Sequence, residues 1–362
     1  MSKFIKKATT TAQVEVFVPN VTFNNLPISN RLKENIVKRG FATPTPIQDR
    51  VIPHILEGKD VIGIANTGTG KTAAFLIPLL EKVVKNNGEN ILIIVPTREL
   101  ALQIRDELRL LADRMNIYSS LCIGGSSIRT QLFELKRNPH FIIGTPGRLK
   151  DLVERKALRL SAFNTIVLDE VDRMVDMGFI HDVKYLLSLL PEKRHSLFFS
   201  ATISSQINDI IHSFLRNPIT VSVRSQDTPE NVDQDIVRIE NGAYKIDILE
   251  RLLKKNEYQK VLIFGRTKRG VERLSASLYQ KGFKVASIHG DKPQSKRQQA
   301  IRLFKEDVVN ILVATDVAAR GIDIANISHV INYDQPATYE DYIHRIGRTG
   351  RANQKGYALT FV

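Results

Sequence analysis

The sequence has one cysteine, no tryptophan and no long apolar run. A single cysteine, Cys122, excludes an intrachain disulfide and any cysteine-rich metal site, and is typical of a reducing compartment. No run approaches the roughly 18–20 apolar residues that a membrane-spanning helix needs. The first 20 residues contain no signal-peptide core, because Glu15 interrupts their apolar stretch. We therefore expect a cytoplasmic protein that does not bind membranes, with a short organellar transit peptide as the alternative for the basic, Thr-rich N-terminus.

Positive charge is in excess throughout the chain. Its 362 residues include 52 Lys and Arg against 38 Asp and Glu, a net charge of +14. Residues 230–362 contribute +6 of this and residues 1–229 the other +8, so no single tail carries the excess. Distributed positive charge favours a polyanionic partner, nucleic acid before a membrane surface, although charge that only keeps the protein soluble would look the same.

Short apolar, β-branched runs alternate with segments of helical periodicity. This pattern is typical of parallel sheets covered by helices on both faces, and the length favours two such α/β domains. Around residues 224–235 the alternation is interrupted by a polar segment, which we interpret as a linker. The expected strands are Ile91–Pro96, Phe141–Thr145, Thr165–Glu170, Leu197–Thr202, Val261–Phe264, Val285–His289, Ile311–Thr315 and Val330–Tyr333, with one further run after residue 351.

A glycine-rich segment follows the apolar run at residues 60–64. It reads ANTGTGKT and comprises Ala65, Asn66, Thr67, Gly68, Thr69, Gly70, Lys71 and Thr72. The glycines allow successive backbone N–H groups to point at phosphate oxygens, and a helix starting after Lys71 adds its positive end. Lys71 is expected to reach the β- and γ-phosphates and the Thr72 hydroxyl to hold Mg²⁺.

Two acidic residues end the apolar strand at residues 165–168. In TIVLDEVD, Asp169 is placed to coordinate Mg²⁺ through water, and Glu170 to orient or deprotonate the attacking water. Together with the glycine-rich loop, this pair predicts a nucleoside-triphosphate site.

Regularly spaced arginines occur near the end of the chain, in HRIGRTGR at residues 344–351. An arginine at the γ-phosphate is worth roughly 10³–10⁵ in rate. If these arginines come from a second domain, they reach the phosphate only when the domains close, which would couple closure to hydrolysis. A basic loop that binds nucleic acid or solvent alone is the alternative.

The order of these motifs resembles the DEAD-box family of ATP-dependent RNA helicases, from Phe23 to the end of the chain. The resemblance implies two RecA-like parallel-sheet domains in tandem, joined by a short flexible linker. It divides the chain into an N-terminal extension (1–22), an ATP-binding domain (23–223), a linker (224–235) and a C-terminal domain (236–362). GFATPTPIQ at residues 40–48 resembles the family's adenine-reading motif, in which Gln48 bonds the adenine edge and Phe41 packs on the ring, with Phe23 upstream.

The resemblance also implies RNA-binding, coupling and further nucleotide-binding residues. In the first domain, the RNA-binding residues would be Pro96, Thr97, Arg98, Gly125, Thr145, Pro146, Gly147 and Arg148. In the second, they would be Arg266, Gly290, Gln294, Arg297, Thr315 and Arg320. Asp323 would bond the ribose, and Arg348 and Arg351 the γ-phosphate. Residues that couple ATP state to strand separation would be Asp172, Ser200, Thr202, His344 and Arg345.

One position departs from the family signature Asp-Glu-Ala-Asp, because Val171 stands in place of the alanine. Asp169, Glu170 and Asp172 are all present, so we expect the metal and water chemistry to be retained. The two methyl groups that valine adds could overpack the site and change the coupling to Ser200 and Thr202.

The predicted function is RNA-stimulated ATP hydrolysis that drives closure of two domains on one RNA strand and local, non-processive duplex separation. ATP and Mg²⁺ are the expected cofactors, RNA read through its backbone is the expected partner, and proteins of ribonucleoprotein complexes are further partners of a monomeric core. Three alternatives stay open: an ATP-gated RNA clamp without significant unwinding, a DNA helicase, and a metabolic phosphotransferase.

Overall fold

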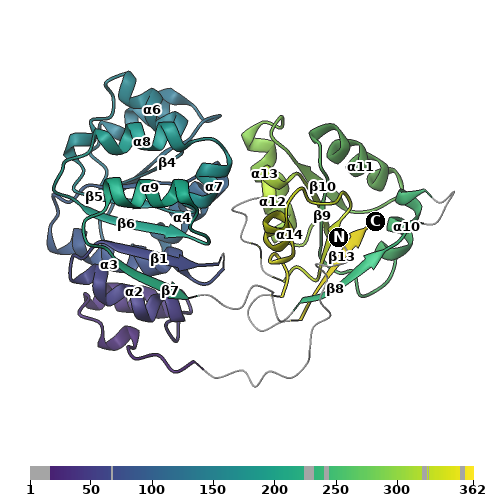
Figure 1. The fold of residues 1–362 in the computed structure, drawn as a ribbon, viewed down its shortest axis with the longest axis horizontal. Helices are drawn as coiled ribbons and strands as arrows, with labels where there is room; N and C mark the ends of the chain where they lie inside the picture. Colours follow the sequence, from purple (N-terminus) through teal and green to yellow (C-terminus); the bar gives the residue numbers. More distant parts are fainter. Residues whose placement is uncertain are drawn as a thin grey trace. The chain divides into compact units, whose positions relative to one another are not determined.

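The computed structural model describes residues 17–66, 68–223, 232–239, 244–319, 324, 326–350 and 355–362 (Figure 1). The chain divides into two compact units that meet in the sequence at residues 224 and 225. Each unit has its own sheet, in which every pair of neighbouring strands is parallel. The predicted α/β class with two parallel sheets is confirmed.

The first unit contains a seven-stranded sheet in the order β3-β4-β2-β5-β6-β1-β7. Its strands are β1 (Val61–Ala65), β2 (Ile91–Ile94), β3 (Ser119–Cys122), β4 (Phe141–Gly144), β5 (Thr165–Leu168), β6 (His195–Ser200) and β7 (Ile219–Val223). The four predicted strands of this unit and the apolar run before the glycine-rich segment are all present. The two edge strands, β3 and β7, were not predicted, because their polar residues interrupt the continuous apolar pattern of buried parallel strands.

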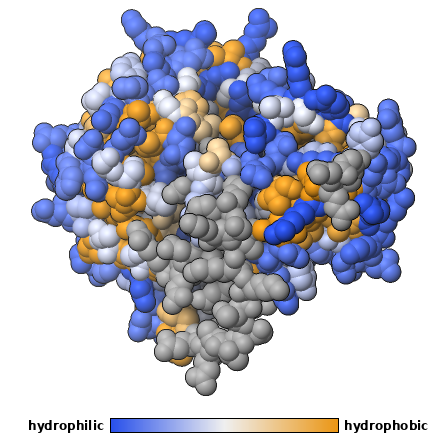
Figure 2. All heavy atoms as spheres, turned by 45° about the vertical axis from the view of Figure 1, so that its right-hand side comes forward, coloured by the Kyte–Doolittle hydropathy of each residue, from blue (hydrophilic) through white to orange (hydrophobic). Residues whose placement is uncertain are grey.

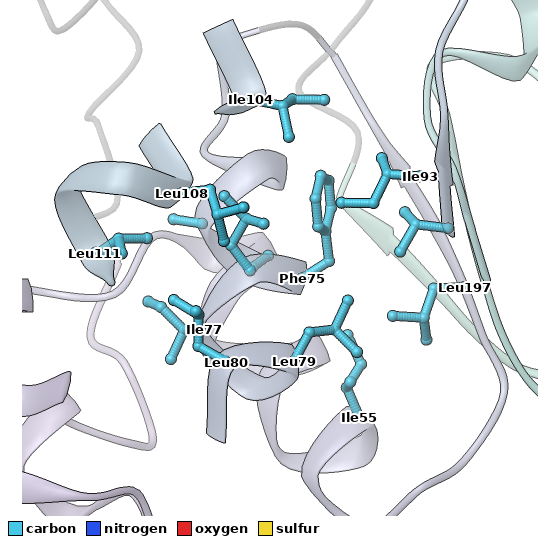
Figure 3. Packing of buried hydrophobic residues seen from close by; sticks show 14 of the residues in the cluster. Ile55, Phe75, Ile77, Leu79, Leu80, Ile93, Ile104, Leu108, Leu111 and Leu197 are labelled. Atoms are coloured by element: carbon cyan, nitrogen blue, oxygen red, sulfur yellow. The ribbon is translucent and has the colours of Figure 1, made fainter. Parts of the chain in front are cut away.

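Helices cover both faces of this sheet. They are α1 (Asn30–Lys38), α2 (Pro46–Leu56), α3 (Lys71–Lys85), α4 (Arg98–Leu111), α5 (Ile128–Leu135), α6 (Pro146–Glu154), α7 (Val171–Asp176), α8 (Ile180–Ser188) and α9 (Ser205–Phe214), with short 3-10 turns η2 (Phe23–Asn25) and η3 (Leu160–Ala162). Side chains of α1–α4 form one core with alternate residues of the strands, and α5–α9 form a second core with the others. In Figure 3, Phe75 of α3 lies among side chains of α4, β2 and β6. These helices thereby fix the sheet from which the site loops emerge.

The second unit contains a six-stranded sheet in the order β10-β11-β9-β12-β13-β8. Its strands are β8 (Val232–Val237), β9 (Val261–Phe264), β10 (Val285–Ile288), β11 (Ile311–Ala314), β12 (His329–Asn332) and β13 (Gly356–Phe361). The linker was predicted at residues 224–235, but residues 232–235 belong to β8. This edge strand was missed because its sequence, VDQDIV, carries three polar residues. Residues 224–231 lie outside the described part of the chain.

Five helices of the second unit lie within the described residues. They are α10 (Lys245–Leu253), α11 (Lys268–Gln280), α12 (Gln294–Lys305), α13 (Asp316–Ala319) and α14 (Tyr339–Ile346). Helices α10 and α11 share one core with the sheet, and α12 and α13 share a second core, built on alternate residues of the same strands. Helix α14 packs on β8 and β13.

Among the described helices, none has both the length and the apolar composition needed to cross a bilayer. On the face shown in Figure 2, hydrophobic side chains lie in separate groups bordered by hydrophilic ones.

Candidate functional site

The glycine-rich loop connects the end of β1 to the start of α3. Gly68 and Gly70 have φ angles of 83° and 93°, a region that side chains strain to enter. A Cβ on Gly70 would also lie 2.5 Å from Gln48 Nε2. Glycine is therefore required here both for the turn and for the close approach of α2. The loop ends at the N-terminus of the 15-residue helix α3, whose free N–H groups suit a phosphate. Thr67 lies outside the described residues.

Lys71 and Gln48 are both tied to this loop. The Lys71 ammonium is buried and donates to the Ala65 carbonyl at 2.7 Å. Gln48 Nε2 donates to the Gly70 carbonyl at 3.1 Å, while its Oε1 accepts from the Thr45 backbone N–H at 2.9 Å. A primary amide has two N–H donors and two acceptor lone pairs, so one of each is left for a ligand.

Two aromatic rings adjoin α2. Phe23 and Phe41 stack with ring centroids 6.4 Å apart and planes at 29°. Phe23 is buried and Phe41 is half-buried, with the Arg39 guanidinium 5.4 Å from its ring. Both were predicted to bind ATP. Phe23 supports Phe41 from the core, and Phe41 is the ring with accessible surface.

The acidic pair lies at the end of β5, and both side chains are buried. Asp169 is 2% exposed and Glu170 4% exposed. Asp169 Oδ1 accepts from the Glu170 backbone N–H at 2.9 Å. Burial raises the pKa of Asp169 to about 7; Glu170 and Asp172 act in the same direction and Lys71 opposes them. The Lys71 ammonium is thus close enough to the Asp169 carboxyl to interact with it electrostatically.

The donor set fits the predicted magnesium ion. Among the described residues no group of three or more His, Cys, Asp or Glu side chains surrounds a common point. Mg²⁺ typically uses one or two protein oxygens and completes its shell with phosphate and water, so Thr72 and Asp169 suffice. A cation beside Asp169 would also offset the cost of ionising this buried carboxyl.

Strand β6 lies between β5 and β1, and its end is bonded to the acidic segment. Asp172 Oδ2 accepts from the backbone N–H groups of Ala201 and Thr202 at 3.0 and 3.1 Å. In return, Ser200 Oγ accepts from the Asp172 N–H at 3.3 Å and donates to the Thr202 carbonyl at 2.7 Å. Thr202 therefore contributes its backbone N–H and carbonyl to this network.

The RNA-binding candidates of the first unit follow β2, β3 and β4, which form the other half of the same sheet edge. Thr97 caps α4 by accepting from the Leu100 N–H at 3.2 Å, and the neighbouring Arg98 lies against Gly124, where a Cβ would come 2.8 Å from its guanidinium. Thr145 and Pro146 begin α6, Gly147 has open space at its Cα, and Gly125 adopts a φ of 76°. Arg148 donates to Gln131 Oε1 at 3.0 Å. Small residues and helix N-termini gather here, as close contact with a sugar–phosphate backbone requires.

In the second unit the corresponding candidates follow β9, β10 and β11. Arg266 is exposed, Gly290 lies beside Lys268, and Thr315 follows β11. Gln294 and Arg297, on the first turns of α12, are largely buried. Arg320 lies outside the described residues. The structure brings the described members to one edge of the second sheet.

The basic segment at the end of the chain is described only up to residue 350. Arg345 is 2% exposed and donates two bonds to Asp316, at 2.6 and 2.7 Å, with others to Asn332 and Asp334. Arg348 is also buried, and its Nε donates to the His344 carbonyl at 3.3 Å. Arg345 thus has its partners within its own unit. Arg351 and Asp323 lie outside the described residues.

Sequence reasoning missed Arg173, whose guanidinium binds the Glu170 carboxylate at 2.9 Å. Its three-residue spacing from Glu170 at the start of a helix was the available signal. It also missed Asp316, which follows β11 and holds Arg345.

Two family profiles match the chain. Residues 45–210 match "DEAD/DEAH box helicase" and residues 244–353 match "Helicase conserved C-terminal domain". Among curated proteins, the DEAD-box ATP-dependent RNA helicase CshA of Bacillus cereus is 45% identical over 94% of this chain. The CshA protein of Geobacillus kaustophilus is 46% identical over the same share. The chain spans 65% of the first relative's length and 73% of the second's.

Solved structures of similar proteins cover both units. Saccharomyces cerevisiae Dbp5 bound to RNA and ADP BeF3 aligns with a TM-score of 0.83 at 32% identity, covering 94% of this chain and 89% of that one. The DEAD-box helicase Mss116 bound to ssRNA and UDP-BeF gives a TM-score of 0.86 at 30% identity, with 95% and 76% coverage. A DEAD box protein from Methanococcus jannaschii is 40% identical, with a TM-score of 0.57 and coverage of 95% and 94%.

Proposed function

Because the chain belongs to the DEAD-box family of ATP-dependent RNA helicases, we propose that it hydrolyses ATP when RNA is bound and separates short RNA duplexes locally. The observation that carries this proposal is the arrangement at one edge of the first sheet. The glycine-rich loop follows β1, the acidic pair follows β5, and the serine–threonine segment follows β6 between them. Ligands of open α/β sheets bind at this carboxyl-terminal edge.

Each residue of the loop and the acidic pair has a proposed role toward ATP. The backbone of residues 66–70 and the N-terminus of α3 hold the phosphates, and Lys71 leaves the Ala65 carbonyl to reach the β- and γ-phosphates. Glu170 orients the attacking water and accepts its proton as the bond to the γ-phosphorus forms. Thr72 and Asp169 would hold Mg²⁺, which would neutralise charge on the phosphate oxygens.

Specificity for ATP and for RNA comes from different parts of the first unit. The remaining donor and acceptor of Gln48 match the N7 and N6 edge of adenine, with Phe41 against the ring. Phosphate and 2′-hydroxyl contacts from the loops after β2, β3 and β4 would hold RNA without reading its sequence.

Domain closure completes the proposed cycle. When the two units close around ATP and one RNA strand, Arg348 and Arg351 reach the γ-phosphate, Asp323 the ribose, and Thr315 and Arg320 the nucleic acid and nucleotide. Hydrolysis then weakens closure and releases the RNA. A monomeric core, a cytoplasmic location and protein partners in ribonucleoprotein complexes belong to the same proposal.

The test is steady-state ATP turnover at fixed low salt without nucleic acid, with single-stranded RNA, or with DNA of the same sequence. We expect strong stimulation by RNA alone, and its loss in Lys71→Ala and Glu170→Gln. Lys85→Ala is the matched control for the first variant, because it removes an exposed lysine at the other end of α3. Glu154→Gln is the matched control for Glu170→Gln, because it makes the same change at an exposed glutamate on α6. Equal stimulation by DNA, or none by either, contradicts the proposal.

The alternative is an ATP-gated RNA clamp that holds RNA without significant unwinding. Both functions predict that Glu170→Gln blocks turnover and keeps ATP-dependent RNA binding. They differ in the wild-type protein, where a helicase displaces the strand of a short duplex and a clamp retains it with slow product release. Strand displacement and RNA dissociation measured in the same samples decide between them.

A further inference from the structure

The backbone at Glu170 is strained. Its φ and ψ are 54° and 50°, the left-handed region that costs a non-glycine residue energy. Eight described non-glycine residues have a positive φ, and Glu170 is the one among them whose side chain is buried. Such strain persists only where surrounding contacts hold the residue in place, and it is characteristic of functional sites.

The contact that meets the Glu170 side chain is Arg173. Its Nη1 donates to Glu170 Oε2 at 2.9 Å, and Arg173 is 1% exposed. Both partners of this ion pair are therefore removed from water. A second nitrogen, Nη2, is buried with no hydrogen-bond partner among the described residues.

Ordinary stability does not account for this arrangement. Burying an ion pair costs desolvation that good geometry only just repays, and here one nitrogen is left unpaired. What the pair does achieve is to engage one oxygen of the carboxylate and to restrict its rotation.

We propose that Arg173 is a positioning residue that holds the Glu170 carboxylate where it meets the water attacking ATP. This inference rests on the function proposed above. Arg173 acts through Glu170, whose Oε2 it occupies while Oε1 serves the water. A misplacement of about 1 Å in such a group costs roughly 10²-fold in rate.

The experiment compares Arg173→Met, Arg173→Lys and wild type in RNA-stimulated ATP turnover. We expect Arg173→Met to lower kcat about 10²-fold with KM for ATP little changed, since the carboxylate is misplaced and the phosphate loop is intact. Arg173→Lys restores the charge through one donor without the planar fork, so its kcat should lie between the other two. In the Glu170→Gln background, Arg173→Met should cause no further loss.

Lys82→Met is the matched control. It breaks an ion pair between the half-buried Lys82 and the buried Glu89, 2.9 Å apart. This pair lies beside Thr165, at the opposite end of β5 from Glu170. It should lower thermal stability and leave kcat unchanged. If Arg173 were only structural, Arg173→Met would behave in the same way.

A crystal structure of the full chain with Arg173→Met gives a readout that needs no turnover. We expect the Glu170 carboxylate to rotate or lose order there, and if the Met variant does not fold, the Lys variant serves for the same comparison. Any of four results would overturn the inference. Arg173→Met could keep the wild-type kcat or change only KM for ATP, its effect could add to that of Glu170→Gln in the double variant, or the Glu170 carboxylate could keep its position in the crystal. Absence of RNA-stimulated turnover in wild type would instead overturn the proposed function, and the position of Glu170 in the crystal would still decide the role of Arg173.

Discussion

Each unit buries an arginine against an acidic side chain at the carboxyl-terminal edge of its sheet, and the two arginines differ in how fully they are bonded. In the second unit, Arg345 makes four hydrogen bonds, two of them to Asp316, and its guanidinium lies 5.1 Å from the Phe264 ring. In the first unit, Arg173 makes one ion pair, to Glu170, and has a buried nitrogen with no partner among the described residues.

This difference distinguishes charges that hold the fold from charges that serve chemistry. A guanidinium has five donors, so Arg345 uses nearly all of its capacity inside its own unit, as a structural arginine does. Four buried charged residues of the first unit, Lys71, Asp169, Glu170 and Arg173, make fewer hydrogen bonds than Arg345. They belong to the glycine-rich loop and to the segment that follows β5. The comparison predicts opposite outcomes for mutations in the two units.

The largest expected effect is on stability, in Arg345→Met. Removing the guanidinium leaves Asp316 half-buried without its partner, which typically costs about 3–5 kcal/mol. Hydrogen exchange read by mass spectrometry reports each unit separately, and we expect peptides of β11, β12 and α14 to lose protection. Arg302→Met, at an exposed position of α12, is the control. Unchanged protection with turnover lost would place Arg345 in the chemistry and break the comparison.

The next effect is on rate, in Lys71→Ala. Among the described residues, the ammonium donates only to the Ala65 carbonyl of its own loop, so its loss should change the stability of the first unit little. Removing a preorganised donor to developing charge costs about 10²–10³-fold in kcat. Turnover and thermal unfolding of the same preparation test this. A fall in melting temperature large enough to explain the lost activity would count against a chemical role.

A pH-dependent effect is expected in the second unit, at His329. Its ring is buried between Tyr258 and Tyr357, with centroids at 4.0 and 5.0 Å, and burial lowers its pKa to about 4 from an ordinary 6.5. The unfolded chain therefore binds the proton first as pH falls. The contribution of neutral His329 to the free energy of unfolding is fully present above about pH 6.5. It is lost progressively as the pH falls from about 6.5 to 4, and the loss is on the order of 3 kcal/mol.

His329→Phe keeps the ring stack and removes the titration. The difference in denaturant midpoint between wild type and variant should thus grow in favour of the variant as pH falls from about 6.5 to 4. A difference that stays constant with pH would show that His329 does not titrate in this range.

Much of this arrangement is readable from the sequence, because buried parallel strands are continuous apolar runs and the loops after them carry the motifs. The edge strands β3, β7 and β8 were not predictable in this way, since one open edge tolerates serine, threonine and aspartate. The role of Arg173 was not predictable either. Spacing alone suggests an ordinary helical pair, and the left-handed backbone of Glu170, which supports the proposed role, is visible only in the structure.

The smallest expected effect concerns Val171, where the family signature has alanine. Its side chain is fully buried in the core that α5–α9 share with the sheet. If the neighbouring side chains pack closely around valine, Val171→Ala removes two buried methyl groups and lowers the free energy of unfolding by about 1.5 kcal/mol. Val183→Ala in the same core should have the same effect. If valine instead strains the segment between Glu170 and Asp172, Val171→Ala is neutral or stabilising, while Val183→Ala still destabilises. Thermal unfolding of the two variants, with RNA-stimulated turnover alongside, separates these cases. We expect the first, because the Asp172 bonds to Ala201 and Thr202 are intact with valine in place.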